Sequence, residues 1–237
     1  MAFLSQIIGK LFRFIYNYLV SLGNEPANIS YYAIALLIMA VIYKLITIPL
    51  TIQSTKQSQK AQSLQPQMEE LKKKYGYDQR IYTQKVQELQ KEHNVAGAGC
   101  SSCLMMIIQM IIVIALFNVI REPQRYLFDD PKKINTIAKN FFWIKDLSLK
   151  DPTGFVLALL NSLTQFLVSF LSSMNTPGAP AGAMQTQKMM LYIFPLVFFF
   201  VFRTLPAGLV LYWVAGNIIE IIVKLITKAF SARKQEA

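Results

Sequence analysis

One apolar run limits most strongly what this chain can fold into. The run extends from Tyr31 to Ile52 and contains a single charged residue, Lys44. About 20 apolar residues, at ~1.5 Å each in a helix, cross the ~30 Å core of a bilayer, so the run predicts a transmembrane helix. Lys44 then lies inside the membrane, where a charge costs ~2.5–3.5 kcal/mol on insertion scales and usually faces a partner or a wet cavity.

The composition extends this prediction to the whole chain. Of the 237 residues, 54% are hydrophobic, and further apolar runs alternate with polar segments. This pattern is typical of an all-α, polytopic membrane protein, whereas a soluble nucleic-acid binder would carry less apolar sequence. The formal net charge of +11 indicates anionic lipids as contacts first, and ribosomal RNA second. The sequence predicts no cofactor.

Residues 1–25 differ from the rest because apolar and polar residues alternate at helical spacing. Phe12 and Ile15 fall on the apolar face, whereas Arg13 and Asn17 mark the polar face. The spacing predicts an amphipathic helix lying in the membrane interface, with a sixth span as the alternative. The start of the chain lacks the basic residues and the small-residue cleavage site of a cleaved signal peptide.

Residues 26–237 are predicted to form one membrane domain with five transmembrane helices. The apolar runs place these spans at about 31–52, 101–120, 153–171, 188–202 and 207–226. Residues 53–98 are rich in Gln, Lys and Glu and predict a cytoplasmic helical hairpin, and residues 227–237 form a basic tail. An odd number of spans puts the termini on opposite sides. The distribution of Lys and Arg favours an outside N-terminus and a cytoplasmic C-terminus.

With this topology, four spans carry polar side chains at a similar depth in the cytoplasmic half of the membrane. These residues are Lys44, Gln109, Gln165, Asn217 and Glu220. Intramembrane polar residues indicate a functional site, here a polar cavity or groove open to the cytoplasm. The alternative is that they only hold helices together by hydrogen bonds. Glu220 is the candidate ion-pair partner of Lys44, although its carboxylate would also suit headgroups or a partner protein.

Four stretches, taken in their order and spacing, carry a specific pattern. They are 44–51 with 64–66, 91–100 with Gln109, 142–152, and 194–217. Over about residues 30–225 this pattern resembles the YidC family of membrane protein insertases, in the short form of bacteria with a single membrane. Many members have arginine where this chain has Lys44, so the positive charge is kept but the planar fork with five donors is not.

The resemblance implies a mechanism and a location in the cell membrane. A polar groove would receive the hydrophilic segment of a nascent membrane protein and release its apolar helix into lipid. Lys44 would attract the charge of the segment, and the apolar side chains of Phe166, Phe170 and Val210 would guide its apolar part. The resemblance further implies a working monomer, with the ribosome, the signal recognition particle system and the Sec translocon as candidate partners.

Other functions compete with this interpretation. An enzyme such as an intramembrane protease is disfavoured, because the only histidine, His93, lies in the polar segment and no span contains an aspartate. A zinc site of His93, Cys100 and Cys103 would have three ligands, so buried small residues explain the cysteines better and no metal is predicted. A transporter of an anionic small molecule or lipid, and a chaperone that binds helices without inserting them, are the remaining alternatives.

Overall fold

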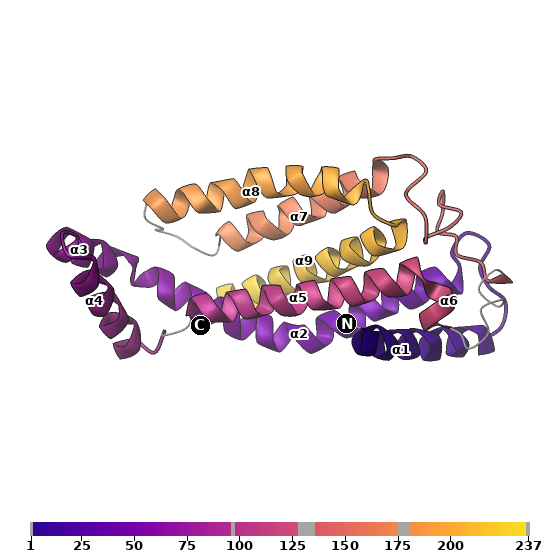
Figure 1. Cartoon of the computed structure of the whole chain (residues 1–237), viewed down its shortest axis with the longest axis horizontal. Helices are drawn as coiled ribbons and strands as arrows, with labels where there is room; N and C mark the ends of the chain where they lie inside the picture. The colour runs from indigo at the N-terminus through magenta and orange to yellow at the C-terminus, as the bar shows by residue number, and fades with distance from the viewer. Residues whose placement is uncertain (1, 96–97, 128–135, 175–180, 236–237) are drawn as a thin grey trace.

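Every regular element in the described part of the chain is a helix. The computed structural model describes residues 2–95, 98–127, 136–174 and 181–235 (Figure 1). The helices are α1 (Ala2–Ser21), α2 (Tyr31–Ser63), α3 (Gln65–Tyr75), α4 (Gln79–Glu92), α5 (Ala98–Arg121), α6 (Pro123–Tyr126), α7 (Val156–Met174), α8 (Ala181–Phe202) and α9 (Ala207–Gln235). The predicted all-α fold class is confirmed for these residues.

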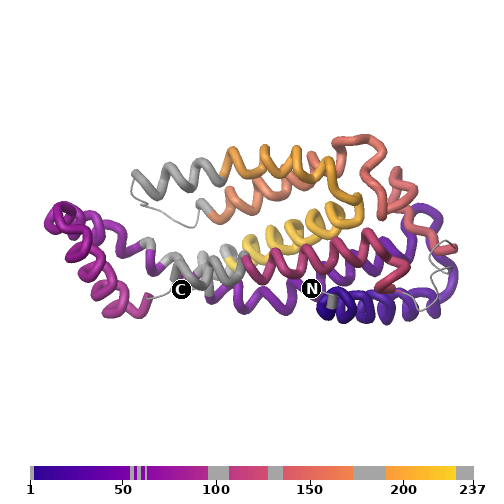
Figure 2. The backbone as a smooth tube through the Cα atoms, in the orientation of Figure 1, coloured from indigo at the N-terminus to yellow at the C-terminus, as the bar shows by residue number. Residues whose placement is uncertain are grey.

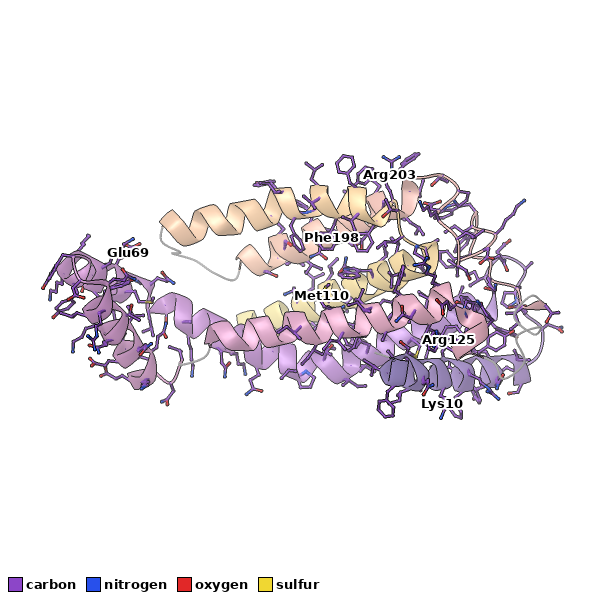
Figure 3. The ribbon with its side chains drawn as sticks, in the orientation of Figure 1. Lys10, Glu69, Met110, Arg125, Phe198 and Arg203 are labelled. Carbon is purple, nitrogen blue, oxygen red and sulfur yellow. The ribbon has the colours of Figure 1, made fainter. Side chains whose placement is uncertain are left out.

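The bundle consists of helices α2, α5, α7, α8 and α9, which lie lengthwise beside one another (Figure 1). Helix α9 contacts α2, α5 and α7, and α8 packs against α7. Figure 2 shows the same path of the chain as a tube, with α3 and α4 projecting from one end. We call this end, which carries Glu69, the hairpin end (Figure 3). Residues 136–155 lie at the opposite end, beyond Arg203, which we call the loop end.

Two helical segments are long and apolar enough to cross a membrane, namely Tyr31–Gln53 and Ala207–Thr227. Shorter apolar segments occupy Ile107–Arg121, Val156–Ser172 and Leu191–Phe202. One boundary of each segment coincides with the limit of the residues whose side chains the structure describes. The outer surface of the bundle exposes many large apolar side chains, among them Leu45, Ile46, Leu196, Phe200 and Ile222. Extensive exposed apolar surface is typical of a membrane-facing protein.

Helix α1 runs lengthwise beside α2 and α5 and does not lie across the end of the bundle (Figure 1). On its buried face, the ring of Phe12 packs 4.9 Å from that of Tyr32, and a Cβ at Gly9 would overlap the carbonyl of Tyr126. Several apolar side chains of α1 are nevertheless exposed, among them Phe3, Ile7, Phe14 and Tyr18. An interfacial helix has one apolar face. The buried face of α1 packs against α2 and α5, and its orientation relative to the membrane stays a prediction.

Residues 136–155 join the starts of α2 and α9 through backbone hydrogen bonds. The N–H of Ser30 donates to the carbonyl of Asn140 at 3.0 Å, and the N–H of Gly208 donates to the carbonyl of Leu147 at 2.8 Å. A Cβ at Gly208 would lie 3.0 Å from that Leu147 oxygen, so the close approach favours glycine. Helices α2 and α9 therefore begin together at the loop end and run in the same direction.

Asp151 caps the start of α7 at the loop end. Its carboxylate accepts hydrogen bonds from the backbone N–H groups of Thr153 (3.0 Å) and Leu157 (2.9 Å), and from the indole of Trp143 (3.2 Å). Burial on its own raises the pKa of Asp151, but the hydrogen bonds outweigh burial and hold the pKa below its usual value. The ionised form therefore fixes the first turn of α7.

Helices α3 and α4 pack against each other at the hairpin end, and neither contains a buried residue. Helix α4 begins at Asp78, whose carboxylate accepts from the N–H groups of Arg80 (2.9 Å) and Ile81 (3.1 Å). At the base of the pair, Leu64 and Val95 are buried together. A small apolar contact thus attaches an otherwise exposed helix pair to the bundle.

Candidate functional site

A cavity of about 190 Å³ lies between helices of the bundle, and polar groups line much of it. Its lining residues are Tyr43, Lys44, Gln109, Gln165, Val168, Tyr212, Trp213, Gly216, Asn217 and Glu220. These residues come from α2, α5, α7 and α9. The five polar residues that the sequence places at one depth therefore share one cavity.

The common direction of α2 and α9 explains why Lys44 and Glu220 meet. Lys44 is the thirteenth residue after Tyr31, the first of α2, and Glu220 is the thirteenth after Ala207, the first of α9. At ~1.5 Å per residue, both lie about 20 Å from the loop end. Gln109 lies at a similar depth on α5, which ends at the loop end twelve residues later. Helix register thus sets the level of the cavity.

Lys44 and Glu220 form an ion pair across the cavity. The Nζ atom of Lys44 lies 2.7 Å from Oε2 of Glu220, and 19% and 24% of the two side chains are exposed. A paired charge inside an apolar bundle costs less than an isolated one. Gly216 gives Lys44 room, because a Cβ there would lie 3.2 Å from the Lys44 Cε atom.

A second lysine holds the other oxygen of the same carboxylate. The Nζ atom of Lys224 lies 3.5 Å from Oε1 of Glu220, one helical turn further along α9. Only 18% of the Lys224 side chain is exposed. Glu220 is therefore shared between a lysine of α2 and a lysine of its own helix.

Amide and hydroxyl groups connect the helices around this ion pair. The Tyr43 hydroxyl of α2 donates to the side-chain oxygen of Gln109 on α5. On the α7 side, the Asn217 amide donates to Thr164 Oγ1 at 3.2 Å and to Asn161 Oδ1 at 3.4 Å. Asn217 and Asn161 are both buried. Asn217 therefore links two helices as well as lining the cavity, as the interhelical alternative predicts.

Comparison with known proteins identifies the family of this chain. Residues 25–235 match the model of the family described as 60Kd inner membrane protein. Relatives called Membrane protein insertase YidC, from Francisella philomiragia subsp. philomiragia and Francisella tularensis subsp. novicida (strain U112), are 36% and 37% identical over 202 residues. The match covers 85% of this chain and 33% of each relative. The chain belongs to the YidC family.

A solved YidC structure has the same fold. It is described as an active YidC insertase crystal structure with the first transmembrane domain resolved, and it is 27% identical with a TM-score of 0.53. The likeness covers 81% of this chain and 41% of that one. The chain spans about a third of the length of the YidC relatives it matches. The resemblance predicted from the sequence motifs is confirmed, and with it a location in the membrane.

The three apolar residues that the YidC resemblance singles out do not lie on one surface. Phe166 and Phe170 stack on α7 with ring centroids 6.1 Å apart, and Phe170 is exposed. Phe166 also lies 6.3 Å from the ring of Tyr192 on α8. Val210, by contrast, is only 2% exposed and belongs to the core. Cys100 and Cys103 are not among the residues whose side chains the structure describes.

Sequence analysis missed four residues of the site, namely Tyr43, Tyr212, Gly216 and Lys224. Lys224 had a usable signal, because residues four apart on a helix are neighbours and Glu220 precedes it by four. Gly216 had none, because its role depends on where the Lys44 side chain from another helix lies. The two tyrosines look like ordinary apolar helix residues until the helices are packed.

Proposed function

We propose that this chain is a membrane protein insertase and chaperone. Its groove is the cavity around Lys44, which receives the hydrophilic segment of a nascent membrane protein. The observation that carries the proposal is a lysine in a spanning-length apolar helix that lines a partly accessible cavity with polar groups from three other helices. Similarity to proteins called Membrane protein insertase YidC supports it.

The proposed topology has five spans, formed by α2, α5, α7, α8 and α9. The hairpin end faces the cytoplasm, the loop end faces outside, and the C-terminus is cytoplasmic. The exposed lysines of α3, Lys72, Lys73 and Lys74, support this orientation, because cytoplasmic segments are enriched in basic residues. Such a surface also suits anionic lipids of the inner leaflet, and the ribosome, the signal recognition particle system and the Sec translocon stay as candidate partners.

The groove acts by lowering the cost of moving polar groups through the bilayer. A polar group without a hydrogen-bond partner in an apolar medium costs roughly 2–7 kcal/mol, and each group of the passing segment incurs it. Side chains such as Gln109, Gln165 and Tyr43 replace part of the lost hydration. Lys44 adds attraction for an acidic side chain, and charge-assisted hydrogen bonds are roughly twice as strong as neutral ones. No covalent step is needed, and a single chain suffices as the working unit.

The apolar part of the substrate leaves along α7. Phe166 and Phe170 form a stacked aromatic surface there, beside the cavity residue Val168. Such a surface offers an apolar helix favourable contact as it passes into lipid. Because Val210 is buried, the guide surface consists of the two phenylalanines in the conformation described.

The alternative, a transporter of an anionic small molecule or lipid through the same cavity, is less well supported. The cavity of about 190 Å³ is smaller than the roughly 300–1,000 Å³ of typical small-molecule sites. An extended tail that enters a few residues at a time fits these dimensions better than a whole lipid headgroup.

Reconstitution tests the proposed function. Proteoliposomes containing only this protein receive a single-span substrate with a short acidic tail, and protection of the tail from added protease reports insertion. The wild type is expected to protect the tail well above empty liposomes. Lys44→Ala is expected to lower protection about tenfold, the effect of losing ~1.4 kcal/mol of attraction. Lys145→Ala, at an exposed residue of the loop end, is the matched control. Protection no better than in empty liposomes would contradict the proposal.

A further inference from the structure

Glu220 is the centre of a three-residue charge cluster with Lys44 and Lys224. One carboxylate oxygen faces Lys44 at 2.7 Å and the other faces Lys224 at 3.5 Å. Each side chain is less than a quarter exposed, so their interactions are screened less than those of surface charges. Two lysines and one glutamate leave the cluster with a formal charge of +1.

A single additional carboxylate would neutralise this cluster. If it binds Lys44, Glu220 still has Lys224 as a partner, and each of the two carboxylates then has one ammonium. If Lys224 were absent, the same event would leave Glu220 as an unpaired, largely buried charge. Removing one partner of a buried pair is strongly destabilising, because the remaining charge is not compensated.

We propose that Glu220 is an exchangeable counter-ion that the substrate displaces from Lys44. An aspartate or glutamate of the translocated segment takes the place of Glu220 at Lys44, and Lys224 retains Glu220 during the exchange. The attraction of Lys44 for an acidic side chain therefore depends on Lys224. Lys224 acts as a positioning residue, because its contact is with Glu220 and it does not line the cavity. The inference rests on the proposed insertase function and adds the roles of Glu220 and Lys224 to it.

The formal charge of the cluster predicts how each variant treats an acidic segment. Lys224→Gln makes the cluster neutral and removes the second partner of Glu220. Glu220→Gln makes it +2, which favours acidic segments more strongly. The double variant Glu220→Gln with Lys224→Gln leaves Lys44 alone and restores +1. A merely structural cluster predicts that two substitutions disturb the fold more than one does, so rescue by the double variant separates the two roles.

The test uses two substrates that differ at one tail position, aspartate or asparagine, in proteoliposomes. The measured quantity is the ratio of Asp-tail to Asn-tail insertion. We expect Lys224→Gln to lower this ratio about tenfold, or ~1.4 kcal/mol. An unchanged thermal unfolding temperature in detergent shows that the variant is folded. We expect the double variant to restore the ratio to the wild-type value, and Lys145→Gln, the control, to leave it unchanged.

Two results would overturn the inference without touching the insertase function. One is wild-type insertion of both tails with an unchanged ratio in Lys224→Gln. The other is a double variant no better than Lys224→Gln. Failure of the insertase function looks different, because the wild type would then insert neither tail better than empty liposomes do. Equilibrium binding of the two labelled tail peptides to the same proteoliposomes, without insertion, should show the same order of variants.

Discussion

At the scale of single residues, the cavity depends on how closely Lys44 approaches helix α9. Gly216 has no side chain, and a Cβ at this position would lie 3.2 Å from the Lys44 Cε atom. Four residues later, Glu220 receives the Lys44 ammonium. One small residue and one acidic residue on the same face of α9 thus hold a charge that an apolar bundle would otherwise disfavour.

Replacing Gly216 with alanine should separate stability from function. Alanine is ~1 kcal/mol better than glycine inside a helix, so thermal stability in detergent should stay equal or rise. Insertion of an acidic tail should fall roughly threefold to tenfold, because the new methyl group moves Lys44 and small misplacements in a site are costly. Gly208→Ala is the control, since its Cβ would meet the Leu147 carbonyl and the Leu36 side chain and should lower stability. Equal loss of stability in both variants would contradict this role of Gly216.

At the scale of elements, helix boundaries could be predicted where the sequence contains a clear stop. Pro206 separates α8 from α9, and α9 begins at Ala207, the residue predicted for the fifth span. The first span was expected to end near Ile52, but α2 continues to Ser63. Gln and Lys are good helix formers, so the helix leaves the apolar run without a break. Helix α2 ends at Ser63, shortly before Pro66.

Element packing could not be predicted in the same way. The periodicity of α1 gives its apolar residues but not which of them face protein, so its lengthwise position follows only from contacts with α2 and α5. The polar residues of the cavity could be predicted, because depth along a helix depends on residue number alone. Their partners could not, since the pairing of Tyr43 with Gln109 depends on how α2 and α5 are rotated.

The cap of α7 should be sensitive to pH. Hydrogen bonds hold the pKa of Asp151 below its usual value, so the folded state favours the ionised form. Its contribution is therefore complete above the unfolded pKa of about 3.9 and is lost as pH falls through the lower folded pKa. Asp151→Ala removes both acceptor oxygens and should cost about 0.5–2 kcal/mol near neutral pH. Thermal unfolding of both proteins in detergent at several pH values measures this, and a gap that does not narrow at low pH would contradict it.

At the scale of the whole molecule, the account requires the two ends of the bundle to face opposite sides of the membrane. Tyr77 between α3 and α4 and Leu149 at the loop end are both highly exposed. With Cys100 and Cys103 replaced by serine, we expect an impermeant maleimide to label Leu149→Cys in intact cells. Tyr77→Cys should react only after lysis, because it faces the cytoplasm. The reverse pattern would show that the proposed orientation is inverted.

The central claim is that a hydrophilic substrate segment enters the cavity during insertion. Val168 lines the cavity, whereas its neighbour Leu167 is exposed on another side of α7. The test uses a substrate that is arrested during insertion and carries a cysteine beside the aspartate of its tail. The insertase carries Val168→Cys or Leu167→Cys, with Cys100 and Cys103 replaced by serine. An oxidant then forms a disulfide wherever the two cysteines are in contact. The account predicts disulfide formation at position 168 and little at position 167. Equal crosslinking at both positions, or none at 168 while the substrate inserts, would contradict it.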